Sequence, residues 1–165
     1  MTDLKYGKLL DFVQEIGTIM YVGGILSHIV IGANLGHSDA LTAHHVYQYK
    51  LISAYILILP GLGLKLLVDL ISWKLYSVVP NWLKFKLAMM TFLTINAFVF
   101  LVPMMPELTE LAKASIPAGE VSQTFLDLAH TEQLVGMSNV IPLLLEILLS
   151  SFKPRLFSER RVAAA

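Results

Sequence analysis

The stretch LKFKLAMMTFLTINAFVFLVPM, residues 83–104, decides the fold class, because it is almost entirely apolar and carries charge only at Lys84 and Lys86. A helix needs about 20 predominantly apolar residues to cross the hydrocarbon core of a bilayer. The stretch therefore predicts a membrane-spanning helix. Three further runs of the same character lie at about 9–35, 46–73 and 133–152. The sequence predicts an all-α membrane protein, a bundle of four transmembrane helices that forms a single domain over residues 1–165.

The composition agrees with this fold class, since 56% of the residues are hydrophobic, 15% are charged and the mean hydropathy is +0.68. The chain has no cysteine, which excludes disulfides, iron–sulfur clusters, thiolate nucleophiles and haem attached through C-x-x-C-H. It carries no nucleotide-binding, hydrolase or zinc-protease motif and no basic nucleic-acid patch. The lipid bilayer is therefore an expected partner, and nucleic acid is not. Asp3, Asp11 and Glu15 interrupt the first run and argue against a cleaved signal peptide.

The basic residues predict how the chain is oriented. They gather at the N-terminus, around the second connection and at the C-terminus: Lys5, Lys8, Lys74, Lys84, Lys86, Lys153, Arg155, Arg160 and Arg161. The first connection has no Lys or Arg, and the third has one lysine against several acidic residues. The positive-inside rule then places both termini in the cytoplasm of a bacterial inner membrane. All five histidines fall in the outer half.

His28 is the principal site candidate, because an ionisable side chain within a membrane span indicates a function by default. Gly24 and Gly32, one turn before and one turn after it, leave room for a neighbouring helix or a flat cofactor. Neutral imidazole is a common ligand of haem iron. We predict that haem b binds in the outer half of the bundle with His28 as one axial ligand. A hydrogen bond from the imidazole to a neighbouring helix is the alternative.

The second haem ligand stays open among several residues near the outer surface. His130 begins the fourth helix, which we expect to lie beside the first, and His44 and His45 begin the second. Met137 lies two turns below His130 on the same face and would give His–Met ligation, unless it is ordinary core packing. At ~1.5 Å per residue, His28 lies roughly 10 Å below the end of its helix, which is deeper than His130. We expect His37 to be a hydrated loop residue.

A second group of charged residues lies in the inner half of the predicted bundle: Asp11, Glu15, Lys65, Asp69, Lys86 and Glu146. Each would be costly to bury alone, so we expect them to pair across the bundle as a structural ionic lock or a proton relay. Glu146 should pair with Lys65 or Lys86. Lys65 could instead extend toward the interface marked by Trp73.

Local signals predict several details of the helices. The prolyl segment PGLG at 60–63 should kink the second helix, and Asn96 should hydrogen-bond to another helix. Residues 105–115 read as a short amphipathic surface helix between helices 3 and 4, with Leu108 and Leu111 toward lipid. Ser122 or Thr124 should cap the helix that follows.

The second half of the chain carries several short motifs that occur together. A helix opens with Trp82, Lys86 and Leu87, Pro103 or Pro106 stands near its outer end, and the last helix has Asn139, Ile141 and Pro142 at its start and Lys153–Pro154 at its stop. In these features the chain resembles a group of small bacterial membrane proteins. The group includes the membrane-bound protoporphyrinogen IX oxidase family, the copper-resistance D-type membrane domain and predicted integral membrane proteins.

The resemblance implies a haem- or metal-associated redox membrane protein, and it matches Lys86 to the lysine of the family's third helix. It carries no haem ligand over, because those families place a histidine early in the first helix, where this chain has Gln14 and Glu15.

Together the sequence predicts a haem b membrane protein that transfers electrons, with its status as an enzyme open. One alternative is a non-catalytic anchor or subunit of a larger redox or transport complex, or a homo-oligomer. Another is the handling of copper or a similar transition metal at the outer histidines, with Met104 and Met105 as soft ligands. The electron donor, the acceptor and any organic substrate do not follow from the sequence.

Overall fold

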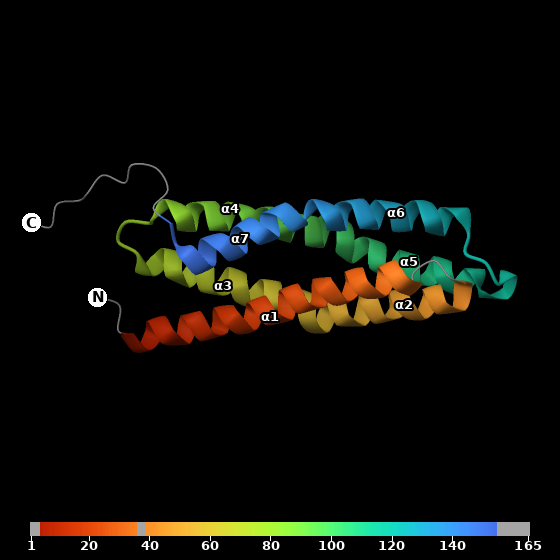
Figure 1. Cartoon of the computed structure of the whole chain (residues 1–165), viewed down its shortest axis with the longest axis horizontal. Coiled ribbons are helices and arrows are strands. Elements are labelled where there is room, and N and C mark those ends of the chain that lie inside the picture. Colours follow the sequence, from red (N-terminus) through yellow and green to blue (C-terminus); the bar gives the residue numbers. More distant parts are fainter. Residues whose placement is uncertain (1–3, 36–38, 155–165) are drawn as a thin grey trace, which may run out of the picture.

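Four long helices run antiparallel to their neighbours in chain order (Figure 1). The computed structural model describes residues 4–35 and 39–154. Helix 1 is α1 (Leu4–Leu35), and helix 2 joins α2 (Ala40–Ser53), the π-helical η1 (Ala54–Ile58) and α3 (Leu59–Leu75). Helix 3 joins α4 (Asn81–Ile95), the π-helical η2 (Asn96–Leu101), α5 (Val102–Ser115) and the 3-10 turn η3 (Ile116–Ala118). Helix 4 joins α6 (Gln123–Ser138) and α7 (Val140–Phe152).

All four helices are long and apolar enough to cross a membrane, over Gly7–Leu35, Ala40–Leu75, Asn81–Ala118 and Gln123–Phe152. This confirms the predicted all-α, four-helix bundle of a multi-pass membrane protein. We call the end that holds the start of α1, the connection 76–80 and the end of α7 the basal end. The opposite end, with connections 36–39 and 119–122, is the distal end.

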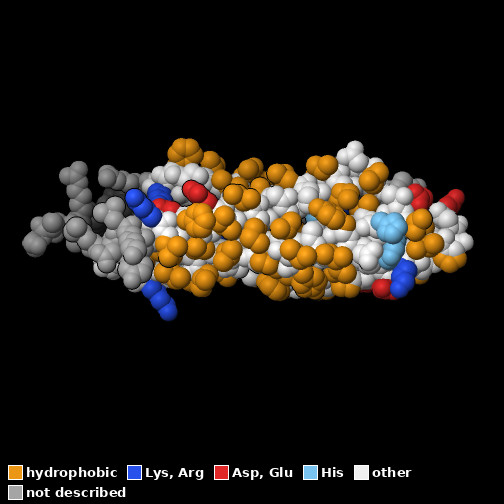
Figure 2. Space-filling view, turned by 90° about the horizontal axis from the view of Figure 1, so that it is seen from below, with side chains coloured by type: hydrophobic (Ala, Val, Ile, Leu, Met, Phe, Trp, Pro, Cys, Tyr) orange, Lys and Arg blue, Asp and Glu red, His pale blue; other side chains and the backbone are white. Residues whose placement is uncertain are grey.

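The helices are longer than the predicted spans, mostly at the distal end. Helix 3 has 38 residues, which at ~1.5 Å per residue is roughly 57 Å, whereas the hydrocarbon core of a bilayer is about 30 Å thick. Figure 2 shows hydrophobic side chains over the length of the bundle, with charged and histidine side chains toward its ends. Helix 3 is therefore longer than a straight crossing of the hydrocarbon core requires.

Two hydrophobic cores lie one above the other in the bundle. The distal core comes from α2, α5 and α6: Ala43, Val46, Tyr47, Met105, Leu108, Ala112, Phe125 and Ala129. In it, the rings of Tyr47 and Phe125 meet edge to face with centroids 5.1 Å apart. The basal core draws on all four helices: Tyr21, Leu62, Met90, Leu93, Ala97 and Leu143. Helix 1 thus belongs mainly to the basal core.

The segment 105–115 differs from the prediction. It is the continuation of helix 3 rather than a separate surface helix. Leu108 is fully buried in the distal core and Leu111 is half-buried against it, so the prediction that both face lipid was wrong. The reason is that α2 and α6 run beside α5 and cover its apolar face. The predicted cap is confirmed, because the Ser122 hydroxyl accepts a hydrogen bond from the Phe125 amide at 3.2 Å.

Each π-helical segment ends shortly before a proline, η1 before Pro60 and η2 before Pro103. Proline has no backbone N–H and its ring displaces the carbonyl four residues earlier. A π turn shifts the hydrogen bonding to a carbonyl five residues earlier and accommodates that change within a helix. Helix 2 therefore runs on through PGLG, and the predicted irregularity lies just ahead of the proline.

Glycines bring helices 1 and 2 together where they cross in the basal half. A Cβ atom at Gly61 would lie 2.6 Å from the Tyr21 amide nitrogen and 2.9 Å from the Gly17 carbonyl oxygen. Small residues permit this close approach of two backbones, as is typical of membrane helix pairs. The contact holds α1 against α3 at the level of Lys65, whose Cγ lies 2.9 Å from where a Cβ of Gly17 would be.

Candidate functional site

Four charged side chains meet in the basal core, and we call them the basal charge network: Lys65, Asp69, Lys86 and Glu146. The Lys65 ammonium lies 2.8 Å from Glu146 Oε2. The Lys86 ammonium lies 2.5 Å from Asp69 Oδ1 and 3.5 Å from Glu146 Oε1. All four side chains are at most 4% exposed. The network therefore links α3, α4 and α7 by ion pairs that the protein shields from its surroundings.

The helical spacing explains how these charges converge. Lys65 and Asp69 are four residues apart and share one face of α3. The face of α4 that carries Lys86 and the face of α7 that carries Glu146 both turn toward it. Two positive and two negative groups leave the network neutral. Neutrality and mutual contact are the conditions under which buried charges are tolerated in a bundle.

Helix 1 adds uncharged polar groups to the network. The Gln14 amide donates to Glu146 Oε1 at 3.4 Å and to the Ser150 hydroxyl at 3.4 Å, and that hydroxyl donates to Glu146 Oε1 at 3.1 Å. The Thr18 hydroxyl accepts a hydrogen bond from the Lys65 ammonium at 2.7 Å. Since Gln14 and Ser150 are half-buried, they connect the network to the surface of the basal end.

Three buried oxygens of this region have no hydrogen-bond partner among the described residues: Asp69 Oδ2, Gln14 Oε1 and Glu146 Oε2, the last of which is ion-paired with Lys65. Most buried polar atoms in native proteins have a partner, and an exception calls for an explanation. A carboxylate oxygen in this position is open to take up a proton.

The expected pairing of Glu146 is confirmed, because it contacts both Lys65 and Lys86. The expectation that Lys65 extends toward the interface was wrong, since Gly17 leaves room for its stem and the side chain is fully buried. Glu15 was also wrongly assigned to the network. At about 100° per residue it points away from the face of Gln14 and Thr18, and it is exposed.

Asp11 likewise lies outside the network. Its carboxylate is 3.7 Å from the Lys153 ammonium, and both side chains are more than half exposed. The prediction that Asp11 belongs to this group was wrong, because the depth of a charge along the helix does not decide which partners it meets. The side of the helix on which the charge lies decides that.

A polar pair joins helices 3 and 4 between the two cores. The Asn96 amide donates to Asn139 Oδ1 at 2.7 Å and to the Ser138 hydroxyl at 3.2 Å. This confirms the predicted interhelical role of Asn96. Asn96 begins the π-helical segment of helix 3, and Asn139 lies at the junction of α6 and α7. The two irregular points of these helices are therefore tied to each other.

A further buried ion pair lies in the distal half and was not predicted. The Lys50 ammonium is 3.1 Å from Glu132 Oε2 and 4.7 Å from the centre of the Tyr47 ring. Both charged side chains are at most 12% exposed. A lysine within the predicted span 46–73 was the available signal, since a lone cation in such a run needs a partner.

His28 hydrogen-bonds to helix 2, with its Nε2 2.6 Å from the Ser53 hydroxyl oxygen. This is the alternative that the sequence left open beside haem ligation. The room at the two glycines is also filled. A Cβ at Gly24 would lie 2.6 Å from Ile58 Cγ1, and a Cβ at Gly32 would lie 3.1 Å from the Lys50 ammonium. The glycines thus admit side chains of helix 2, and the residues around His28 do not fit a haem.

The candidate second ligands do not converge on His28. The fourth helix begins against α5, not beside α1 as expected. Glu132 turns toward Lys50, so His130, two residues earlier and about 200° around the helix, faces outward and is exposed. Met137 is 63% exposed. Helix 4 would need another rotation to present either residue to His28.

The two other histidines that the structure describes lie on α2. His44 is half-buried with its Nδ1 3.2 Å from the Thr109 carbonyl oxygen, whereas the exposed His45 ring is tilted 46° to it at 5.7 Å. Met105 is buried in the distal core and Met104 packs against that core. His37 lies outside the described residues. Within 4–35 and 39–154, no group of three or more His, Asp or Glu side chains is placed to hold a metal ion.

The basal charge network is therefore the arrangement of reactive groups that the fold brings together most completely. Lys86, which the sequence resemblance singled out, lies within it. Comparison with known proteins adds no further assignment: no protein-family model, no curated protein and no solved structure matches the chain.

Proposed function

We propose that this chain is a multi-pass protein of the bacterial cytoplasmic membrane whose basal charge network transfers protons, as a membrane subunit of a redox or transport complex. The observation that supports it is the convergence of two carboxylates and two ammonium groups from three spanning helices at 4% exposure or less. Ionisable groups inside spanning bundles are characteristic of proton and ion pathways. The basic residues at the basal end favour a cytoplasmic location for that end.

The proposed transfer uses groups that lie in contact. A proton moves from the Lys65 ammonium to Glu146 Oε2 across 2.8 Å, which leaves a neutral amine and a neutral acid. The acid then passes a proton to the Ser150 hydroxyl, 3.1 Å from Glu146 Oε1, as that hydroxyl releases its own proton to water at the basal end. The Lys65 amine takes its replacement proton from the Thr18 hydroxyl at 2.7 Å, which is reprotonated by water. The net charge of the network is unchanged in the first step, so the cost of a lone buried charge is avoided.

A structural ionic lock is the competing function of the same residues, and it makes a different prediction for a variant without the charges. Replacing a buried ion pair by apolar residues of similar size is often neutral or stabilising. If the network is only a structural lock, a variant that folds without the charges keeps its function. If the network is a proton relay, the same variant loses its function.

The test is proton flux into vesicles that contain the purified chain, measured with an entrapped pH-sensitive dye under a potassium diffusion potential. We expect the wild-type chain to carry flux and Glu146→Gln to lower it at least tenfold, while Glu132→Gln, in the distal ion pair, retains it. The decisive variant replaces the whole network with Lys65→Met, Asp69→Leu, Lys86→Met and Glu146→Leu. We expect it to fold and to carry no flux.

Two outcomes overturn the proposal. One is wild-type flux equal to that of empty vesicles, and the other is a folded charge-free variant with wild-type flux. Haem-dependent electron transfer remains a prediction of the sequence alone, because the packing around His28 adds no support to it.

A further inference from the structure

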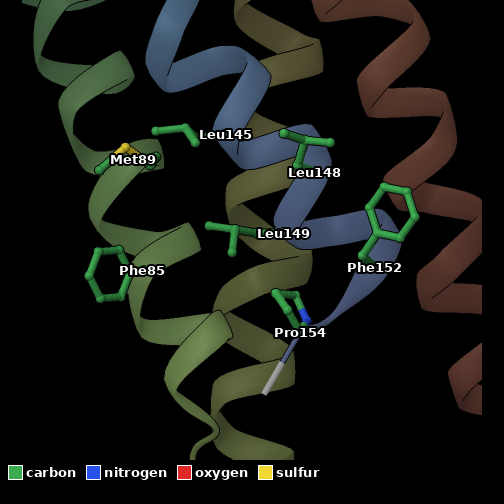
Figure 3. A pocket seen from close by; sticks show the side chains of 7 residues that line it. All are labelled: Phe85, Met89, Leu145, Leu148, Leu149, Phe152 and Pro154. Atoms are coloured by element: carbon green, nitrogen blue, oxygen red, sulfur yellow. The ribbon is translucent and has the colours of Figure 1, made fainter. Parts of the chain in front are cut away.

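An apolar groove lies between α4 and α7 at the basal end, on the outside of the bundle (Figure 3). Seven side chains line it, among them Phe85 and Met89 from α4 and Leu145, Leu148 and Phe152 from α7. Its volume is about 400 Å³, which is within the range of small-ligand sites. Since every lining residue is apolar, the groove suits a hydrocarbon chain rather than a polar solute.

The groove and the basal charge network lie on different sides of α7. Glu146 turns inward to Lys65, whereas Leu145 and Leu148 are 44% and 50% exposed. The groove therefore opens toward the surroundings of the bundle, which in a membrane are lipid chains. It is independent of the ionic chemistry proposed above.

Cationic and aromatic side chains lie at the basal mouth of the groove. Trp82 precedes Phe85 by one turn of α4, and the Lys153 ammonium lies 6.0 Å from the centre of the Trp82 ring. Lys84, two residues after Trp82, lies on another face of α4, where it is exposed and donates to the Asn81 side chain at 3.4 Å. The Asp11 carboxylate, 3.7 Å from the Lys153 ammonium, is the acidic group nearby, and that pair is open to solvent. Tryptophan and lysine together mark the interfacial level of a bilayer.

We propose that the groove binds an acyl chain of an anionic phospholipid from the leaflet at the basal end, with its phosphate at Lys153. The argument rests on complementarity: hydrocarbon lining below and positive charge at headgroup level above. A second copy of the chain suits the groove less well. A twofold axis along the membrane normal would bring the two Lys153 side chains to the same level and close together, where they repel.

The test uses the full-length chain in detergent, titrated with phosphatidylglycerol or with phosphatidylcholine of the same acyl chains, and bound lipids counted by native mass spectrometry. We expect the anionic lipid to be retained at least fivefold better. Lys153→Gln should remove that preference and leave phosphatidylcholine binding unchanged, whereas Lys84→Gln, on another face of α4, should retain it. Leu145→Trp, which fills the groove, should lower the binding of both lipids.

Matched controls separate the groove from general effects on the bundle. Ile141→Trp lies one turn from Leu145 on α7, outside the lining, and Lys113→Gln removes an exposed cation of the distal end. Both should bind lipid as the wild-type chain does. Equal retention of the two lipids by the wild-type chain, or equal losses in the controls, overturns the proposal. So does a disulfide-linked dimer of Phe152→Cys in native membranes, because the chain has no other cysteine and a second copy would then cover the groove.

Discussion

Replacing Gly61 with alanine should separate helices 1 and 2 where their backbones cross. The new Cβ would lie 2.6 Å from the Tyr21 amide nitrogen and 2.9 Å from the Gly17 carbonyl oxygen. These are backbone atoms, so no side-chain rotation relieves the overlap and α1 must move. The matched control is Gly63→Ala, two residues along the same helix, whose Cβ would meet no atom within 4 Å.

The distances set the size of the effect. Ordinary contact begins at 3.4 Å, so α1 must shift by about 0.8 Å. Overpacking of this kind costs about 1–3 kcal/mol, against a gain of about 0.5–1 kcal/mol for alanine over glycine in a helix. Gly63→Ala receives the gain alone. We expect the free energy of unfolding of the two variants to differ by roughly 1–3 kcal/mol, with Gly61→Ala the less stable.

The assay is unfolding in mixed micelles by increasing the mole fraction of sodium dodecyl sulfate, followed by near-UV circular dichroism and tryptophan fluorescence. Gly61→Ala should unfold at a lower mole fraction than the wild-type chain, and Gly63→Ala at an equal or higher one. If both alanine variants unfold at the wild-type midpoint, the backbones of helices 1 and 2 do not meet at Gly61. The contacts of Gln14 and Thr18 with the basal charge network would then also be wrong, because they depend on the same packing of helix 1.

Three further predictions use the same unfolding assay. Asn96→Leu should cost about 0.6–1.7 kcal/mol, the range measured for hydrogen bonds between membrane helices, and the double variant with Asn139→Leu should cost less than the two single effects combined. Lys50→Met should lower the free energy of unfolding by about 3 kcal/mol, because it leaves the Glu132 carboxylate largely buried and uncompensated. Adding Glu132→Leu should restore most of the lost stability. A double variant no more stable than Lys50→Met would contradict the pairing. His28→Ala should cost about 1 kcal/mol for its hydrogen bond to helix 2, whereas a Soret band in the wild-type chain that this variant loses would instead support the haem prediction.

The depth of each charged residue could be predicted from the sequence, but its angular position could not. Glu146 stands alone in a run of leucines and isoleucines, so a buried partner was predictable. Glu15 has a similar depth, yet Gln14 beside it reaches the network. A helix turns by about 100° per residue. Choosing between adjacent residues therefore requires the rotation of helix 1 about its axis, which the packing of Gly17 against helix 2 sets.

The histidines illustrate the same limit. Gly24 and Gly32 predicted free space beside His28. A glycine leaves room for a cofactor and for a side chain of another helix alike, so the sequence does not say which of them occupies it. Helix 2 fills it with Ile58 and Lys50 and offers Ser53 to the imidazole. No pattern in one helix specifies which face of another will cover it.

The sequence by itself determined the number and type of the spans, because the cost of placing polar groups in hydrocarbon is local and can be summed along a run. It also determined that Asn96 and Glu146 need partners, for the same reason. The tertiary structure decided which partners they have, since Lys65 and Lys86 are distant in sequence from Glu146 and meet it through the rotation and depth of three helices. It also decided that Leu108 is buried in a second, distal core, because that burial depends on how far the neighbouring helices α2 and α6 continue beside α5.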